Sequence, residues 1–241
     1  PRGFFSETAR KRGVMKTMNS KRKNQNRKIT EAVVGIAMFA ALAYGVTFVF
    51  RIPVSFLTFD AKDAVITVAS FVYGPIAGVV MSLLTALIEL FTVSGTGFYG
   101  FVMNFVSSAV FAATASGIYK LWRNPRGAVL GPVLAVLTMT GTMLLMNLWI
   151  TPIYMGAPRD QVVAMIPTLL FPVNLAKGLL NAALAMLLYK PLSVALSRAG
   201  LVGRGEEKKS FSWNRTSILI AVVSLLMIAA AVILFVFLKQ K

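Results

Sequence analysis

The 241-residue sequence contains no cysteine and no histidine. Without cysteine, the chain can form no disulfide, CxxC redox pair or thiolate nucleophile. Without histidine, it can form neither an HExxH zinc site nor a histidine-based catalytic triad. A GxxxxGK[ST] phosphate-binding loop is also missing, so a step driven by ATP would need another polypeptide. Because no nucleophile and base pair is evident, we expect that the protein is not an enzyme.

Acidic residues are scarce: 8 Asp and Glu stand against 25 Lys and Arg, which gives a formal net charge of +17. In a soluble protein this charge would suggest binding to nucleic acid. However, 57% of the residues are hydrophobic and the mean hydropathy is +0.74, which is far too apolar for a soluble domain of this size. We therefore predict an all-α integral membrane protein that contacts membrane lipid and no nucleic acid.

Apolar segments divide the chain into four regions. We predict a mobile basic tail at 1–28, a six-helix membrane domain at 29–196, a polar linker at 197–215 and a seventh transmembrane helix at 216–238. The six segments of the membrane domain are residues 30–50, 63–73, 75–91, 101–122, 128–150 and 166–189. Between them we expect a loop or short extended piece at the membrane surface at 51–62, a Gly-rich loop at 92–100 and a polar loop at 151–164.

Lysine and arginine are distributed unevenly between the two sides of this topology. If the tail is cytoplasmic, 19 of them lie on the cytoplasmic side and 5, including Arg51 and Lys62, lie on the opposite side. Loops rich in Lys and Arg remain cytoplasmic in membrane proteins. We therefore expect a multi-pass protein of the cell membrane with its N-terminus in the cytoplasm and its C-terminus outside.

Lys177 lies in the middle of the sixth predicted membrane segment. An ammonium group there costs about 2.5–3.5 kcal/mol on insertion scales unless a partner compensates it. Asn174 and Asn181 lie on the same helical face, because they precede and follow it by three and four residues. We expect this face to point into the protein, at a partner or a ligand. The alternative is a lysine that reaches the headgroups or binds a neighbouring carbonyl.

Further polar residues gather in the outer half of the predicted helices and in the outer loops. They are Glu89, Asn104 and Asn147 near the ends of their segments, and Thr58, Asp60 and Tyr99 in the loops. The inner half holds mainly neutral hydroxyl groups, which can bond to their own helix. We infer a blind pocket that opens to the outside, and not an ion pore.

Small residues recur on one face of the first membrane segment, at Ala37, Ala41 and Gly45, with Ala40 and Ala43 beside them. This spacing lets another helix approach closely. The partner could be a helix of the same chain or a separate subunit.

Three stretches together resemble a known family: FLTFDAKD at 56–63, YGPIAG at 73–78 and PVNLAKGLLN at 172–181. They resemble the S components of energy-coupling factor (ECF) vitamin transporters, most of all the riboflavin-specific members, over about residues 30–192. The resemblance implies a six-helix subunit that captures a vitamin outside and docks on a transmembrane coupling subunit driven by two ATPases. It places Ala37 and Ala41 on the docking surface. No cofactor is implied, since riboflavin would be the transported ligand.

For riboflavin members, the resemblance implies ligand contacts from Leu57, Thr58, Asn147, Asn174 and Lys177. Asparagine can donate and accept hydrogen bonds at the uracil-like edge of a flavin, and a lysine can donate to a carbonyl or ribityl oxygen. The complete set of candidate substrate-binding residues is Leu57, Thr58, Asp60, Glu89, Tyr99, Asn104, Asn147, Asn174, Lys177 and Asn181. Candidates for stacking on the ring are Phe59, Phe98, Tyr99 and Trp149, although aromatic residues also anchor proteins at the membrane interface.

Two other functions are compatible with the sequence. A lysine suits a carboxylate vitamin such as biotin or pantothenate equally well. Buried polar residues can also tie helices together in a membrane scaffold subunit that binds no small molecule. The seventh segment and the long basic tail depart from the family pattern, and the seventh segment is either an accessory helix or part of the surface on which a coupling subunit binds.

Overall fold

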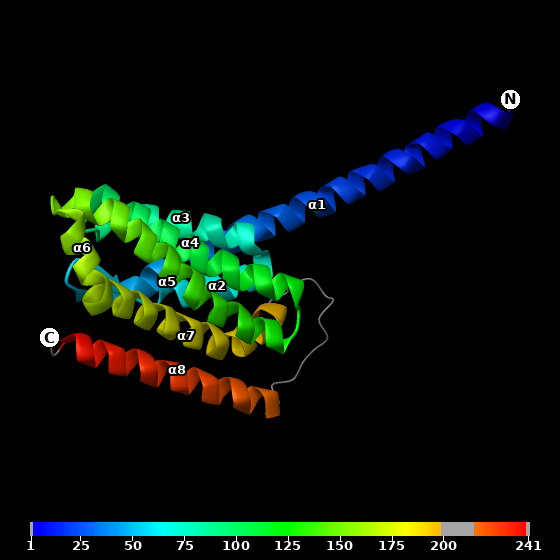
Figure 1. The fold of residues 1–241 in the computed structure, drawn as a ribbon. Coiled ribbons are helices and arrows are strands. Elements are labelled where there is room, and N and C mark those ends of the chain that lie inside the picture. Colours follow the sequence, from blue (N-terminus) through cyan, green and yellow to red (C-terminus); the bar gives the residue numbers. More distant parts are fainter. Residues whose placement is uncertain (1, 199–214, 240–241) are drawn as a thin grey trace. The chain divides into compact units, whose positions relative to one another are not determined.

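The computed structural model describes residues 2–198 and 215–239, which are mostly helical (Figure 1). In chain order the elements are α1 (Arg2–Val49), β1 (Ile52–Val54), β2 (Leu57–Phe59), α2 (Lys62–Tyr73), α3 (Pro75–Thr92), α4 (Gly97–Leu121), α5 (Pro125–Met155), α6 (Arg159–Met165), a π-helical turn (Ile166–Leu170), α7 (Phe171–Arg198) and α8 (Arg215–Lys239). The chain forms two compact units, Pro1–Gly35 and Ile36–Lys241. The boundary between the units therefore falls inside α1.

The first unit consists of the N-terminal part of α1. The basic tail expected at 1–28 is helical over residues 2–28, and its mobility stays a prediction. This stretch has no proline and is rich in arginine and lysine, which are good helix formers. Arg27 and Glu31 add an exposed ion pair at i and i+4, with 2.8 Å between Nε and Oε1. The high charge of residues 2–28 is therefore compatible with a helical backbone.

In the second unit, α2 and α3 form a tight hairpin. The turn is made by Gly74, whose φ of 93° is a left-handed conformation that glycine adopts without strain. Pro75 begins α3, where its missing N–H group is not needed. Gly78 packs so closely on α2 that an added Cβ would lie 2.8 Å from Ser70 Cβ. The geometry of this hairpin thus explains Gly74, Pro75 and Gly78 of the YGPIAG stretch.

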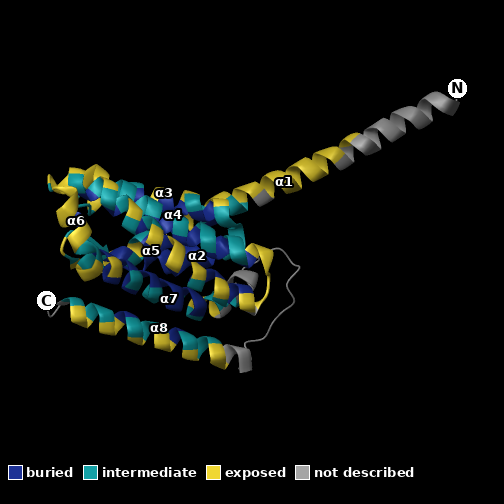
Figure 2. Ribbon diagram, viewed as in Figure 1, coloured by how far each residue is buried: buried dark blue, intermediate teal, exposed yellow. Residues whose placement is uncertain are grey.

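The core of the second unit lies between α2 and the helices around it. All residues of 62–70 in α2 are buried, and Figure 2 shows that α7 is buried along much of its length. Helix α1 packs on the α2–α3 hairpin through Phe39, Ala40 and Ala43. Helices α4, α5 and α7 meet around a second cluster that includes Phe111, Met139 and Ala182.

Aromatic side chains close one end of this bundle. The hydroxyl groups of Tyr119 in α4 and Tyr189 in α7 are 2.7 Å apart. The ring of Phe71 in α2 lies 4.7 Å from that of Tyr119 and 5.7 Å from that of Tyr189. The opposite end of the same helices is hollow.

The prediction of a polar loop at 151–164 is wrong, because most of this stretch is helical. Helix α5 continues through Pro152 to Met155 and ends at Gly156, whose φ of 61° is left-handed. Helix α6 begins after Pro158, and a π-helical turn then leads into α7. The prolines indicated a break in helix, but a proline inside a membrane helix is tolerated where neighbouring groups satisfy the backbone.

Among the described residues, six helices are long and apolar enough to cross a membrane: Met18–Val49, Pro75–Thr92, Gly97–Leu121, Arg126–Met155, Arg159–Tyr189 and Ile218–Leu238. Helix α2 has 12 residues and rises only about 18 Å, so it is too short to cross alone. The prediction of an all-α membrane bundle with an additional C-terminal apolar helix is confirmed. Figure 1 shows that helix, α8, running alongside α7.

The segment before α2 is an antiparallel hairpin of two short strands. Strand β1 pairs with β2 through Val54 and Leu57, and Ser55 turns the chain with a φ of 56°. The extended piece expected at 51–62 is therefore present, but residues 59–62 at its end are buried and do not lie on the surface. The Gly-rich loop ends early, because α4 begins at Gly97.

Candidate functional site

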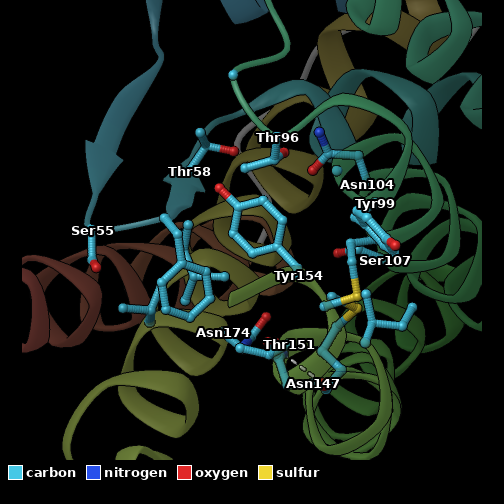
Figure 3. A pocket seen from close by; sticks show the side chains of 18 of the residues that line it. Ser55, Thr58, Thr96, Tyr99, Asn104, Ser107, Asn147, Thr151, Tyr154 and Asn174 are labelled. Carbon is cyan, nitrogen blue, oxygen red and sulfur yellow. Dashed lines mark hydrogen bonds between the residues drawn. The ribbon is translucent and has the colours of Figure 1, made fainter. Parts of the chain in front are cut away.

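The hollow end of the bundle contains a cavity of about 320 Å³. Its walls come from the β1–β2 hairpin, the turn before α4, the first part of α4, the last part of α5 and the first part of α7. Figure 3 shows Thr58, Thr96 and Asn104 on one side of the space, and Asn147, Thr151 and Asn174 on the other. Ligand pockets in proteins have volumes of about 300–1,000 Å³, so this one is large enough for a small molecule.

Seven of the ten predicted binding residues line this cavity: Leu57, Thr58, Tyr99, Asn104, Asn147, Asn174 and Lys177. They come from four different elements that are distant in the sequence. The other three, Asp60, Glu89 and Asn181, do not line it. They are buried beside it. Direct contact of any of these residues with a ligand stays a prediction.

Lys177 points inward, as expected, and it is paired with carboxylates. Its Nζ lies 3.0 Å from Asp60 Oδ2 and 3.7 Å from Asp63 Oδ2. The side chain is only 6% exposed, and it lines the cavity. Since the lysine faces Asp60, lipid headgroups are not its partner.

A second buried lysine stands next to this pair. Lys62 Nζ lies 2.6 Å from Glu89 Oε2 and 3.9 Å from Asp60 Oδ2. We expected Lys62 in a loop at the membrane surface, but its side chain is only 2% exposed. Together these residues form the buried charge cluster, defined as Asp60, Lys62, Asp63, Glu89 and Lys177.

Neutral side chains add hydrogen bonds to the buried charge cluster, although Asp60 Oδ1 and Asp63 Oδ2 have no hydrogen-bond partner among the described residues. Asn104 Nδ2 donates to Glu89 Oε2 at 3.2 Å, and Thr47 Oγ1 donates to Glu89 Oε1 at 3.1 Å. Ser108 donates to Asp63 Oδ1. Asn104 and Lys177 both line the cavity, and each is held in place by a carboxylate of this cluster, Glu89 and Asp60 respectively.

Asn181 stabilises the backbone that carries Asp60. Its Nδ2 donates to the carbonyl oxygen of Asp60 at 2.8 Å, and its Oδ1 accepts from the N–H of Ala64 at 2.8 Å. The sequence placed Asn181 on the face of Lys177, and the structure gives it a positioning role. It holds the start of α2 against α7.

Asp60 lies in the short connection between β2 and α2. Burial alone would raise the pKa of its carboxyl group, but the ammonium groups of Lys177 and Lys62 outweigh burial and hold that pKa below its usual range. Asp60 is therefore ionised at neutral pH. Two ammonium groups then face three carboxyl groups in the buried charge cluster.

The amides of the cavity wall are partly free to bind a ligand. Asn174 Nδ2 donates to Leu170 O at 2.7 Å, and Asn147 Nδ2 donates to Met143 O at 2.7 Å. The oxygen of Asn147 accepts from Thr151 at 2.8 Å, whereas no hydrogen bond to the oxygen of Asn174 occurs within the described part of the chain. Ser107 Oγ is buried and lacks a partner in the same residues. Buried polar atoms of this kind require a partner, which a ligand can supply.

Of the four aromatic residues considered for stacking, only Tyr99 lines the cavity. Phe59 is buried against Phe235, and the ring of the exposed Phe98 is tilted against that of Phe101. Trp149 is 67% exposed, and the guanidinium of Arg159 lies 4.7 Å from its ring. Tyr154 and Phe56, which sequence reasoning missed, line the cavity in their place.

Several other cavity residues were missed because the sequence showed them as ordinary loop or helix residues. They are Arg51, Ser55, Thr96, Ser107 and Thr151. A partner for Glu89 could have been sought, since a carboxylate inside an apolar segment needs one. The search would have suggested Lys62 and Lys177 as partners of Glu89, but the sequence could not have shown which of the two it is.

Comparison with known proteins agrees with this architecture. The family described as "ECF transporter, substrate-specific component" matches residues 31–193. The chain is 30% identical over 191 residues to the riboflavin transporter RibU of Staphylococcus aureus (strain TCH60), an alignment that covers 75% of this chain and all of that protein. A solved S component of a bacterial ECF transporter superposes with a TM-score of 0.60 at 29% identity, over 70% of this chain and 99% of that one.

The matched region contains the whole cavity and the buried charge cluster, and excludes α8. The family is defined as the substrate-specific part of a transporter, and not as an enzyme. This multi-pass membrane chain belongs to the family of ECF transporter substrate-specific components.

Proposed function

We propose that this chain captures riboflavin in the cavity and delivers it to an ECF importer. Three polar side chains on the cavity wall, Asn147, Asn174 and Lys177, carry this proposal. Asparagine matches the alternating donors and acceptors of the uracil-like edge of a flavin, and the lysine can donate to an oxygen atom. Similarity to the riboflavin transporter of S. aureus supports the same ligand.

The charges around Lys177 favour a neutral vitamin over an anionic one. Its ammonium group already faces Asp60 and Asp63, so it is not a spare counter-charge for a carboxylate. Arg51 also lines the cavity, but its guanidinium donates to Val93 O. Biotin and pantothenate carry a carboxylate that would have to approach a cluster with more carboxyl than ammonium groups. Riboflavin carries no charge at neutral pH, and it would be cargo here and not a cofactor.

The cavity would open to the outside of the cell. Lys120, Arg123 and Arg126 follow the aromatic end of the bundle, opposite the cavity. Loops with Lys and Arg remain cytoplasmic. The same rule places the basic N-terminus in the cytoplasm, so that the vitamin enters from outside.

Docking on a coupling subunit with two ATPases would use the outer face of α1. Ala37, Ala41 and Gly45 are exposed there, whereas Phe39, Ala40 and Ala43 pack on the α2–α3 hairpin. A Cβ added to Gly45 would meet no atom of another described element within 4 Å. Small side chains let another helix approach closely. Helix α8 packs on α7, so it leaves this face free.

Mass spectrometry of small molecules released from the purified full-length protein tests the ligand. We expect riboflavin in near-stoichiometric amount, and quenching of flavin fluorescence when riboflavin is added to ligand-free protein. Biotin and pantothenate should not compete. Release of a carboxylate vitamin would contradict riboflavin as cargo. If no small molecule is released and added riboflavin does not bind, a scaffold subunit is favoured.

A further inference from the structure

Helix α8 lies outside the 31–193 region that matches the family, yet it contacts the wall of the cavity. Ala231 of α8 forms a buried cluster with Phe59 of β2 and Ala176 of α7. The rings of Phe59 and Phe235 are 5.5 Å apart at an angle of 39°. Helix α8 thus covers Phe59 of β2, and Val54 of β1 packs against the same cluster.

The same hairpin forms one wall of the cavity. Pro53, Ser55, Phe56, Leu57 and Thr58 all line it. The hairpin therefore lies between the cavity and α8. Its two strands are three residues each, so its own backbone hydrogen bonds are few. A hairpin this small is only marginally stable without packing from outside.

The face of α8 that meets the bundle differs from its other side. Ser224 and Ala231 are buried, and small residues let helices approach closely. Leu225, Leu226 and Ile233 are exposed and match a lipid environment. The contact of α8 is therefore specific to one face, which a simple membrane anchor would not need.

We propose that α8 clamps the β1–β2 hairpin against α7 and thereby slows release of the bound ligand. Without α8, Phe59 would lose the cover of Phe235 and Ala231. The hairpin would then leave its closed position more often, and the cavity would open along this wall. The inference rests on the proposed function for the identity of the ligand, but the restraint on the hairpin is independent of it.

Release of riboflavin from the full-length protein in lipid nanodiscs tests the clamp. Two variants loosen it: Phe235→Ala removes the ring, and Ala231→Leu pushes α8 away from Phe59. Matched controls on the exposed side of α8 are Ile233→Ala and Ala229→Leu. We expect release about tenfold faster in the two variants and unchanged in the controls, as most effects on affinity arise in the dissociation rate.

Amide hydrogen exchange of residues 52–59 in ligand-free protein gives a second measurement. Exchange should be faster in Phe235→Ala and Ala231→Leu than in their controls, while exchange in α4 stays the same. Unchanged exchange in both folded variants overturns the clamp, as does unchanged riboflavin release. If the native protein binds no riboflavin, the proposed function fails, and the exchange measurement alone decides on the clamp.

Discussion

The ammonium group of Lys177 lies 3.0 Å from Asp60 Oδ2, although 117 residues separate the two in the sequence. A lysine in the middle of an apolar helix costs about 2.5–3.5 kcal/mol on insertion scales without a partner. Asp60 is that partner, and it comes from the connection between β2 and α2. The pair therefore fastens the sixth membrane segment to the start of α2, beside the cavity.

Removing one charge of this pair should destabilise the protein. Lys177→Met keeps the apolar stem but leaves Asp60 buried without its closest ammonium group. We expect the free energy of unfolding to fall by about 3–5 kcal/mol, the usual effect of breaking a buried pair from one side. Denaturant unfolding of the protein in detergent measures this. Adding Asp60→Asn to Lys177→Met should restore part of the loss.

Arg126→Met is the matched control, because Arg126 is an exposed cation at the other end of the bundle. It should change the free energy of unfolding by no more than about 0.5 kcal/mol. Equal stabilities for Lys177→Met, its double variant and native protein would show that the pair contributes nothing to folding.

Asn174→Ala should weaken riboflavin binding while leaving the fold intact. The amide oxygen of Asn174 makes no hydrogen bond within the described residues, and its Nδ2 donates only to Leu170 O four residues earlier, so the substitution breaks no hydrogen bond to another helix. Loss of one or two hydrogen bonds to a ligand is about 1.5–3 kcal/mol, or about 10- to 100-fold in Kd. Fluorescence titration measures the change. Gln161→Ala, an exposed position away from the cavity, should bind like the native protein.

Lys177→Ala should weaken riboflavin binding as well, but it also breaks the pair with Asp60. Its effect on affinity is therefore interpretable only beside its effect on stability. Native affinity in both Asn174→Ala and Lys177→Ala would show that the cavity is not the riboflavin site.

The ion pair between Lys62 and Glu89 should contribute to stability and should also hold the side chain of Asn104 in position. Glu89→Gln removes the charge that Lys62 faces at 2.6 Å, and it weakens the acceptor for Asn104. We expect lower stability in Glu89→Gln and in Lys62→Met, and less than additive loss when Glu89→Gln is combined with Lys62→Met. The coupling energy should be about 0.5–3 kcal/mol. Additive losses would mean that the two side chains do not interact.

Ala41→Trp on the exposed face of α1 should separate capture from delivery. A bulky ring there blocks the close approach of another helix, whereas the cavity is untouched. We expect native riboflavin affinity together with loss of uptake in cells that contain the coupling subunit and its ATPases. Ala229→Trp, on the exposed side of α8, is the control and should transport normally. Normal uptake by Ala41→Trp would place docking elsewhere.

The helices of the membrane domain could be predicted from the sequence because hydropathy is a local property. The segments predicted at 75–91 and 101–122 correspond closely to α3 and α4. Proline misled the prediction at 151–164, since Pro152 lies inside α5. The helix over residues 2–28 was not predicted, because this charged stretch has no apolar period.

The candidate site was predictable in its residue types and in part of its membership. Lys177, Asn174 and Asn147 stood out because polar groups in apolar helices need partners or ligands. Tyr154 and Thr151 did not, since they were assigned to a loop. The role of Asn181 was also hidden, because its two partners are backbone groups near Asp60 and Ala64.

The sequence by itself determined that this protein crosses the membrane and that several amides and one lysine lie within its apolar helices, because hydropathy follows from the order of residues. Only the tertiary structure decided that Asp60 neutralises Lys177, that Lys62 turns inward to Glu89, and that α8 covers Phe59 of the hairpin. Ion pairs and packing depend on distances in space, and several pairings of the same charges are equally compatible with their spacing along the chain.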